Sequence, residues 1–172
     1  MSPLGHVRAG SAENLFAHCQ RLSRRGLRYQ YGACDPASGG LDCSGTVQFL
    51  LQKQGISGVP RQANTQYLWL QKARSLRIVD SRMTQERLLS EVRPGDLLFW
   101  EGTYEVQRSP NITHVMVYVG FDRATGKHLM FGARGGRSKG LTGNEVDYFE
   151  FKGLRRRGKG RLAGFGHPPG LL

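Results

Sequence analysis

The sequence predicts an α+β protein in which helices come first and an antiparallel sheet follows. Up to about residue 92, apolar side chains recur at helical spacing. Beyond it they form short β-rich runs separated by glycine-containing turns. The length of 172 residues corresponds to about one domain. We therefore expect a single domain over residues 1–172, with a basic C-terminal segment at about 152–172.

Four segments are predicted to be helical: residues 11–25, 42–54, 62–73 and, more briefly, 84–92. Ser11 and Asp42 are placed to cap the first two, because short polar side chains accept hydrogen bonds from the free N–H groups of a first turn. Cys19 falls on the apolar stripe of the first helix and is expected in the core.

Five segments are predicted to be strands: residues 96–100, 113–119 and 128–133, with weaker candidates at 146–151 and 162–165. Residues 121–127 have the composition of a turn, so the strands on either side of it should pair as a hairpin. Helices followed by antiparallel strands complete the α+β pattern.

The net charge is +12, from 25 Lys and Arg against 13 Asp and Glu. Its densest basic run, residues 155–161, could contact an anionic wall polymer, anionic lipid or nucleic acid, or could simply be a solvated face. No aromatic residue interrupts that run, which argues against base stacking and hence against nucleic acid. No apolar run approaches the roughly 20 residues of a membrane span.

Cys43 lies in an unusual setting for a core cysteine, at the predicted start of the second helix and after a glycine-rich loop. Free N–H groups and the helix dipole at such a position lower a thiol pKa and favour the thiolate. A thiolate nucleophile needs a proton carrier, and His114, at the start of a predicted strand, is the candidate. We expect a Cys43/His114 pair of nucleophile and base, with no metal and no cofactor.

Five segments together resemble the NlpC/P60 cysteine peptidases, in that family's order and spacing: LRYQYGA (27–33), GLDCSG (40–45), VPR (59–61), RPGDLLFW (93–100) and HVMVYVG (114–120). The resemblance implies a papain-like fold and hydrolysis of amide bonds in bacterial peptidoglycan stem peptides, commonly between D-glutamate and a diamino acid. It assigns Cys43 as nucleophile and His114 as base. Tyr29, Asp42 and Ser44 would form part of the substrate site.

The family orients its histidine through a third polar residue, which by position falls here on Gly132. His128 lies on the same strand face and could take that role only if the hairpin register shifts. A backbone carbonyl or Asn144 could substitute.

Two rival functions remain open at this point. The chain could be a catalytically weak or inactive module that binds wall polymer or nucleic acid, or an acyltransferase that uses the same Cys/His pair. A wall hydrolase would work in the bacterial periplasm or outside the cell, secreted or injected, and a role in cytoplasmic recycling is also compatible. The Arg-rich surface would then hold an anionic wall polymer.

Overall fold

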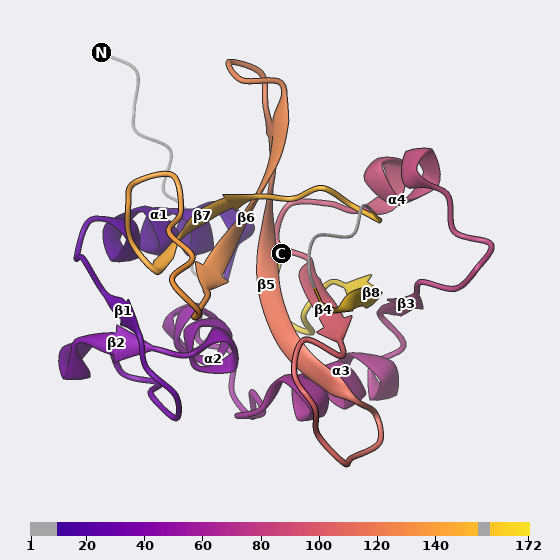
Figure 1. Ribbon diagram of the computed structural model, residues 1–172, viewed down its shortest axis with the longest axis horizontal. Coiled ribbons are helices and arrows are strands. Elements are labelled where there is room, and N and C mark those ends of the chain that lie inside the picture. The colour runs from indigo at the N-terminus through magenta and orange to yellow at the C-terminus, as the bar shows by residue number, and fades with distance from the viewer. Residues whose placement is uncertain (1–9, 155–158) are drawn as a thin grey trace.

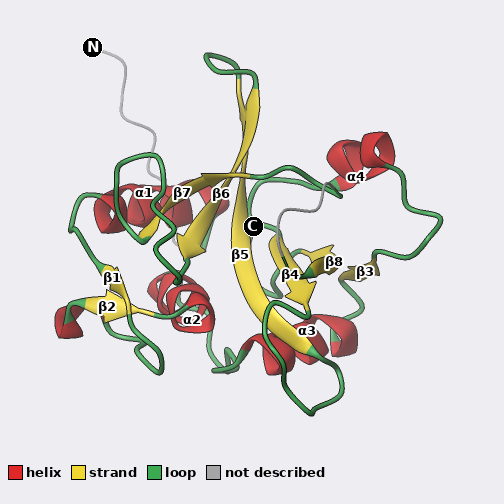
Figure 2. Ribbon diagram, in the orientation of Figure 1, coloured by secondary structure: helices red, strands yellow, loops and turns green. Residues whose placement is uncertain are grey.

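The computed structural model describes residues 10–154 and 159–172. Its main element is a six-stranded sheet in the spatial order β3-β8-β4-β5-β6-β7, with every neighbouring pair antiparallel (Figures 1 and 2). The strands are β3 (Leu76–Ile78), β4 (Leu97–Glu101), β5 (Ile112–Asp122), β6 (Lys127–Ala133), β7 (Val146–Glu150) and β8 (Arg161–Gly166). A separate parallel pair is formed by β1 (Arg28–Tyr29) and β2 (Gly40–Leu41).

The helices are α1 (Ala12–Ser23), α2 (Cys43–Lys53), α3 (Ala63–Lys72) and α4 (Gln85–Glu91), with a short 3-10 helix, η1 (Pro36–Ser38). Side-chain caps fix two of the predicted starts. Ser11 accepts a hydrogen bond from the Asn14 N–H at 3.2 Å, and Asp42 accepts one from the Gly45 N–H at 2.6 Å. The α+β prediction is therefore confirmed.

Successive side chains of β5 face two different cores, because a strand alternates its faces. Val115 and Val117 join the cluster that contains residues of α1 and α2. Met116 and Tyr118 join a second cluster, which includes Leu88 of α4. The sheet thus separates an α1/α2 side from an α4 side, and β5 runs between them.

Much of the C-terminal segment belongs to the main sheet, since β8 is inserted between β3 and β4. The Leu172 N–H also donates to the Gly10 carbonyl at 2.8 Å, which ties the last residue to the start of the described chain. Residues 155–158 of the predicted basic run lie outside the described residues. No helix within 10–154 or 159–172 has both the length and the apolar character needed to cross a membrane.

Candidate active site

Cys43 is the first residue of α2 and is 8% exposed. The thiol lies near the backbone N–H groups of Val115 on β5, of Ser44 and of Cys43 itself. They lower the thiol pKa, but burial outweighs them and raises it to about 11. The prediction of a thiolate favoured by the helix N-terminus is therefore wrong for the free protein, because desolvation exceeds the effect of the helix end.

Asp42 organises the start of α2. Its carboxylate accepts hydrogen bonds from the Gly32 N–H at 2.9 Å and from two Arg61 N–H groups at 3.0 and 2.8 Å, in addition to its capping bond. Arg61 also donates to the Ser44 hydroxyl at 3.0 Å. This bidentate pair holds Asp42, Ser44 and Arg61 as one polar cluster beside the thiol. Sequence reasoning did not select Arg61, and the only signal for it was its place in the VPR segment.

Tyr29 reaches the same place from β1. Burial, followed by the charges that Cys43 and Asp42 would carry, raises the pKa of its hydroxyl, so this group stays protonated and able to donate. Its ring covers Gly135, where a Cβ would lie 3.1 Å from Tyr29 Cδ1. The structure thus brings Tyr29, Asp42 and Ser44 together around Cys43.

His114 precedes Val115 on β5, so its backbone lies one residue along the strand from the N–H group near the Cys43 thiol. Its Nε2 is fully buried and has no hydrogen-bond partner. Burial, and secondarily the positive charge of Arg134, lowers the pKa of His114 to about 3. The imidazole is therefore neutral at pH 7, as a general base must be before it accepts a proton.

The position of the third, orienting residue falls on Gly132, and the space beside it is filled by the thioether of Met116. A Cβ on Gly132 would lie 2.6 Å from Met116 Sδ, so the Met116 side chain occupies the space that a side chain at residue 132 would need. This packing leaves no room for a side chain at residue 132. It leaves Nε2 without the orienting partner that usually fixes a catalytic imidazole.

Neither His128 nor Asn144 is hydrogen-bonded to His114. His128 pairs in register with Phe121, seven residues along β5 from His114, which is about 20 Å on an extended strand. The His128 Nδ1 instead forms a 2.7 Å hydrogen bond with the Tyr118 hydroxyl. The Asn144 amide donates to the Ser23 carbonyl at 2.8 Å. The hairpin register therefore gives no support to the suggestion that His128 orients the base.

A thiol at the N-terminus of a helix, followed along the chain by an antiparallel sheet that carries a histidine, is an arrangement typical of cysteine hydrolases. Within the described ranges, no group of three or more His, Cys, Asp or Glu side chains is placed to hold a metal ion. The class of protein that fold and site define is thus an α+β protein with a Cys/His site.

The family model described as "NlpC/P60 family" matches residues 26–147, and the chain belongs to that family. It is 36% identical over 104 residues to the bifunctional muramidase/DL-endopeptidase CwlT of Bacillus subtilis (strain 168). That match covers 60% of this chain and 26% of CwlT, so the chain spans about a quarter of this curated relative.

Two solved structures share the fold. One is a protein similar to lipoprotein, of the NLP/P60 family, from Staphylococcus aureus subsp. aureus Mu50, with a TM-score of 0.58 and 22% identity over 91% of this chain and 41% of that one. The other is NlpC1 from Trichomonas vaginalis, with a TM-score of 0.53 and 19% identity over 91% of this chain and 42% of that one. Both support the predicted α+β architecture.

Proposed function

We propose that this chain is a cysteine endopeptidase or amidase that hydrolyses amide bonds in peptidoglycan stem peptides, with the bond between D-glutamate and a diamino acid as its target. Family membership and the similarity to a DL-endopeptidase support this class of reaction. The observation that supports the proposal is the placement of Cys43 at the start of α2 and near the Val115 N–H of β5, one residue along that strand from His114.

The reaction begins from a neutral thiol and a neutral imidazole. As the Cys43 sulfur attacks the amide carbonyl, His114 accepts the thiol proton, and a C–S bond forms. Backbone N–H groups at the start of α2, together with the Tyr29 hydroxyl, stabilise the negative charge on the carbonyl oxygen. His114 then protonates the leaving amine as the C–N bond breaks. A water molecule, deprotonated by His114, finally hydrolyses the thioester and restores the thiol.

The polar cluster beside Cys43 would hold the acyl side of the substrate. Arg61 and Ser44 offer donors there, and Asp42 offers a carboxylate that can accept from a substrate amine. Because Asp42 and Arg61 also fix one another, substrate recognition and the local fold depend on the same ion pair.

Such an enzyme would work where its polymer is, in the bacterial periplasm or outside the cell, or on wall fragments recycled in the cytoplasm. The net charge of +12 would favour retention on anionic wall polymer. The unpartnered Nε2 of His114 favours one competing function, a catalytically weak module that binds the wall without cutting it.

The test is to incubate purified peptidoglycan and defined stem peptides with the protein and identify the products by mass spectrometry. We expect new amine and carboxylate termini at one amide bond, and a loss of at least 1,000-fold in rate for Cys43→Ala. The matched control is Cys19→Ala, which removes the buried thiol of α1 and should retain most of the activity. Equal rates for wild type and Cys43→Ala would reject the mechanism, and tight binding without products would support the module.

A further inference from the structure

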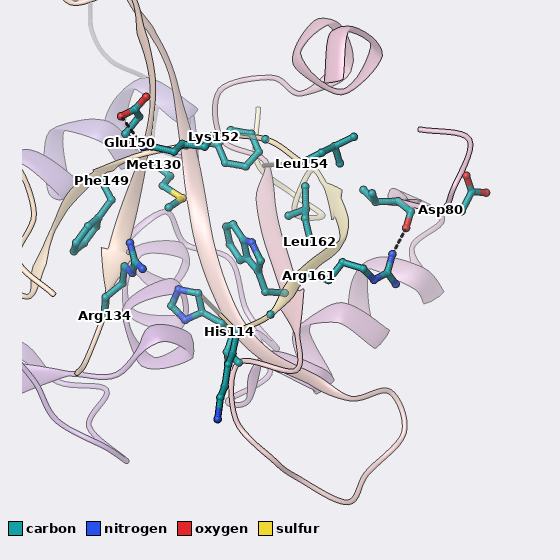
Figure 3. Close-up of a pocket in the computed structure, with 17 residues that line it drawn as sticks. Asp80, His114, Met130, Arg134, Phe149, Glu150, Lys152, Leu154, Arg161 and Leu162 are labelled. Atoms are coloured by element: carbon teal, nitrogen blue, oxygen red, sulfur yellow. Dashed lines mark hydrogen bonds and ion pairs between the residues drawn. The ribbon is translucent and has the colours of Figure 1, made fainter. Parts of the chain in front are cut away.

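A cavity of about 340 Å³ lies apart from the candidate active site, where β3 and β8 meet the end of α4. The larger cavity, of about 450 Å³, opens beside His114, with Trp100 and Arg134 in its wall (Figure 3). Asp96 lines the smaller cavity and comes four residues before Trp100, which is about 13 Å along an extended strand. The smaller cavity is therefore separate from the catalytic groups.

Basic side chains outnumber acidic ones in the wall of the smaller cavity. Three guanidinium groups and two carboxylates line it: Arg74, Arg77, Arg93, Glu91 and Asp96. Glu91 is already held on both of its oxygens, by Arg77 at 3.0 Å and by Arg87 at 2.8 Å. The cavity thus has an excess of one positive charge, and its one partly exposed carboxylate is fully engaged.

The second carboxylate of the wall, that of Asp96, is buried and satisfied by its neighbours. It lies 2.8 Å from His167 Nδ1 and accepts a 3.0 Å hydrogen bond from the Arg93 N–H. The Arg93 side chain is 3.9 Å from it and 66% exposed, so its guanidinium remains available. His167 also lines the cavity, and its Nε2 is a buried polar atom without a partner, which a ligand in the cavity could satisfy.

Arg74 differs from the other two arginines of the wall in having no ion pair with any residue that the structure describes. It directly follows the C-cap of α3, and its φ of 59° lies in the left-handed region that favours glycine. An arginine is costly in this backbone conformation, and such outliers often mark functional positions. An exposed, unpaired guanidinium is therefore placed at the cavity in spite of the backbone.

The chemistry of this wall indicates a phosphate group as the ligand. A carboxylate has two oxygens in one plane, and a single guanidinium can satisfy both. The oxygens of a phosphate point in tetrahedral directions, so a phosphate accepts hydrogen bonds from several donors at once. Arg74, Arg93 and His167 offer such donors from three separate segments of the chain. The cavity is also larger than one phosphate group, so the units on either side of a phosphodiester would fit.

We propose that the smaller cavity binds a phosphate group of a polyol phosphate polymer in the bacterial wall and so holds the enzyme beside its substrate. A phosphodiester carries one negative charge, which offsets the excess of one guanidinium over the carboxylates of the wall. The choice of a wall polymer as the source rests on the proposed function, because the proposed hydrolysis takes place in the wall. The phosphate binding itself does not depend on that hydrolysis.

The binding test titrates inorganic phosphate, and then a glycerol phosphate oligomer, into the full chain while the His167 ring signals are followed by NMR. For the wild type we expect both ligands to shift these signals. Arg74→Gly should weaken the binding at least fivefold, and it should fold because glycine is favoured at this φ. Unchanged His167 signals, or equal binding by the wild type and Arg74→Gly, would overturn the proposal.

The matched control is Arg137→Gly. Among the described residues, Arg137 is the other non-glycine residue with a positive φ, of 69°, and it is exposed in the loop after β6. The substitution removes the same charge and makes the same change to the backbone, so phosphate binding should stay as in the wild type. An equal loss in both variants would show that net charge binds the anion, and would also overturn the proposal.

A wall-binding assay identifies the source of the phosphate. Cys43→Ala protein is sedimented, at physiological ionic strength, with purified walls whose phosphate polymer is intact or has been removed. We expect at least a threefold loss of binding when the polymer is removed, and a similar loss for Cys43→Ala/Arg74→Gly on intact walls. A larger effect of Arg74→Gly on binding to duplex DNA or to phosphatidylglycerol vesicles than to walls would overturn the assignment to a wall polymer.

Hydrolysis of soluble stem peptides, which carry no phosphate, separates this proposal from the proposed function. Arg74→Gly should hydrolyse them at the wild-type rate while it binds walls less well. If the wild type hydrolyses no peptide but still binds phosphate, the proposed function is rejected and the phosphate site is supported. A lower rate on these peptides for Arg74→Gly would show that the substitution acts on the active site, and would overturn the proposal.

Discussion

The two sides of β5 differ in how completely their polar groups are satisfied. On the α2 side, the Asp42 carboxylate receives hydrogen bonds from two backbone N–H groups and from Arg61, and Arg61 reaches Ser44 as well. On the other side, His114 Nε2 is buried without a partner, and Arg134 has no counter-ion among the described residues. The Asp42 carboxylate is fully hydrogen-bonded in the free protein, whereas His114 Nε2 has no hydrogen-bond partner and Arg134 has no anion among the described residues.

The difference separates two uses of polar groups. A satisfied buried cluster stabilises the fold and fixes the start of α2, and with it the position of the thiol. An unsatisfied buried group costs roughly 1–3 kcal/mol in stability, and a ligand that satisfies it binds more tightly for that reason. We therefore expect substitutions in the Asp42 cluster to lower stability more than substitutions beside His114 do.

The largest stability effect is expected from Asp42→Ala. The substitution removes the cap of α2, worth about 1 kcal/mol, and leaves Arg61 without its carboxylate. Because Arg61 is about one-third exposed, we reduce the usual 3–5 kcal/mol for breaking a buried pair and expect a total loss of about 3 kcal/mol. Urea unfolding followed by circular dichroism measures this loss.

Asp35→Ala is the matched control, because Asp35 caps η1 in an exposed position through the Ala37 N–H. It should cost less than 1 kcal/mol. Similar losses for the two variants would show that the α2 cluster is no more important to the fold than an ordinary surface cap.

A smaller effect is expected from filling the third position. Gly132→His alone should lose about 1–3 kcal/mol, because its Cβ would meet Met116 Sδ at 2.6 Å. Adding Met116→Ala relieves that contact. The loss of stability in the double variant should therefore be at least about 1 kcal/mol smaller than the summed losses of the two single variants. The second imidazole could then hydrogen-bond His114 Nε2 and raise kcat.

Gly132→Ala, which adds only the Cβ, serves as the control for the steric part of this effect. Strict additivity of Gly132→His and Met116→Ala would mean that Met116 does not occupy the third position. If the two substitutions are additive in kcat but not in stability, Met116 competes with residue 132 for space, but the added imidazole does not orient His114.

The sequence predicts local structure better than it predicts the state of the site. The α1 and α2 boundaries follow from Ser11 and Asp42, because capping depends on residues within one turn. The short edge strand β3 was missed, since three residues carry too little periodicity. The thiol pKa of Cys43 was predicted in the wrong direction, because burial under β5 is a tertiary effect. Arg134 was missed as a site residue for the same reason, since its cavity is assembled from several separate strands.

The most direct measurement is the pKa of His114 in the free protein, from the NMR shifts of its imidazole against pH. Because burial and Arg134 disfavour the protonated ring, we predict a neutral ring from pH 8 down to about pH 4, with a pKa of about 3. Arg134→Gln should raise this pKa. A His114 pKa at or above the ordinary value of about 6.5 would contradict the predicted effect of burial and of Arg134. A pKa well above 7 would in addition contradict the neutral Cys43/His114 pair and indicate that thiolate and imidazolium are already formed before a substrate binds.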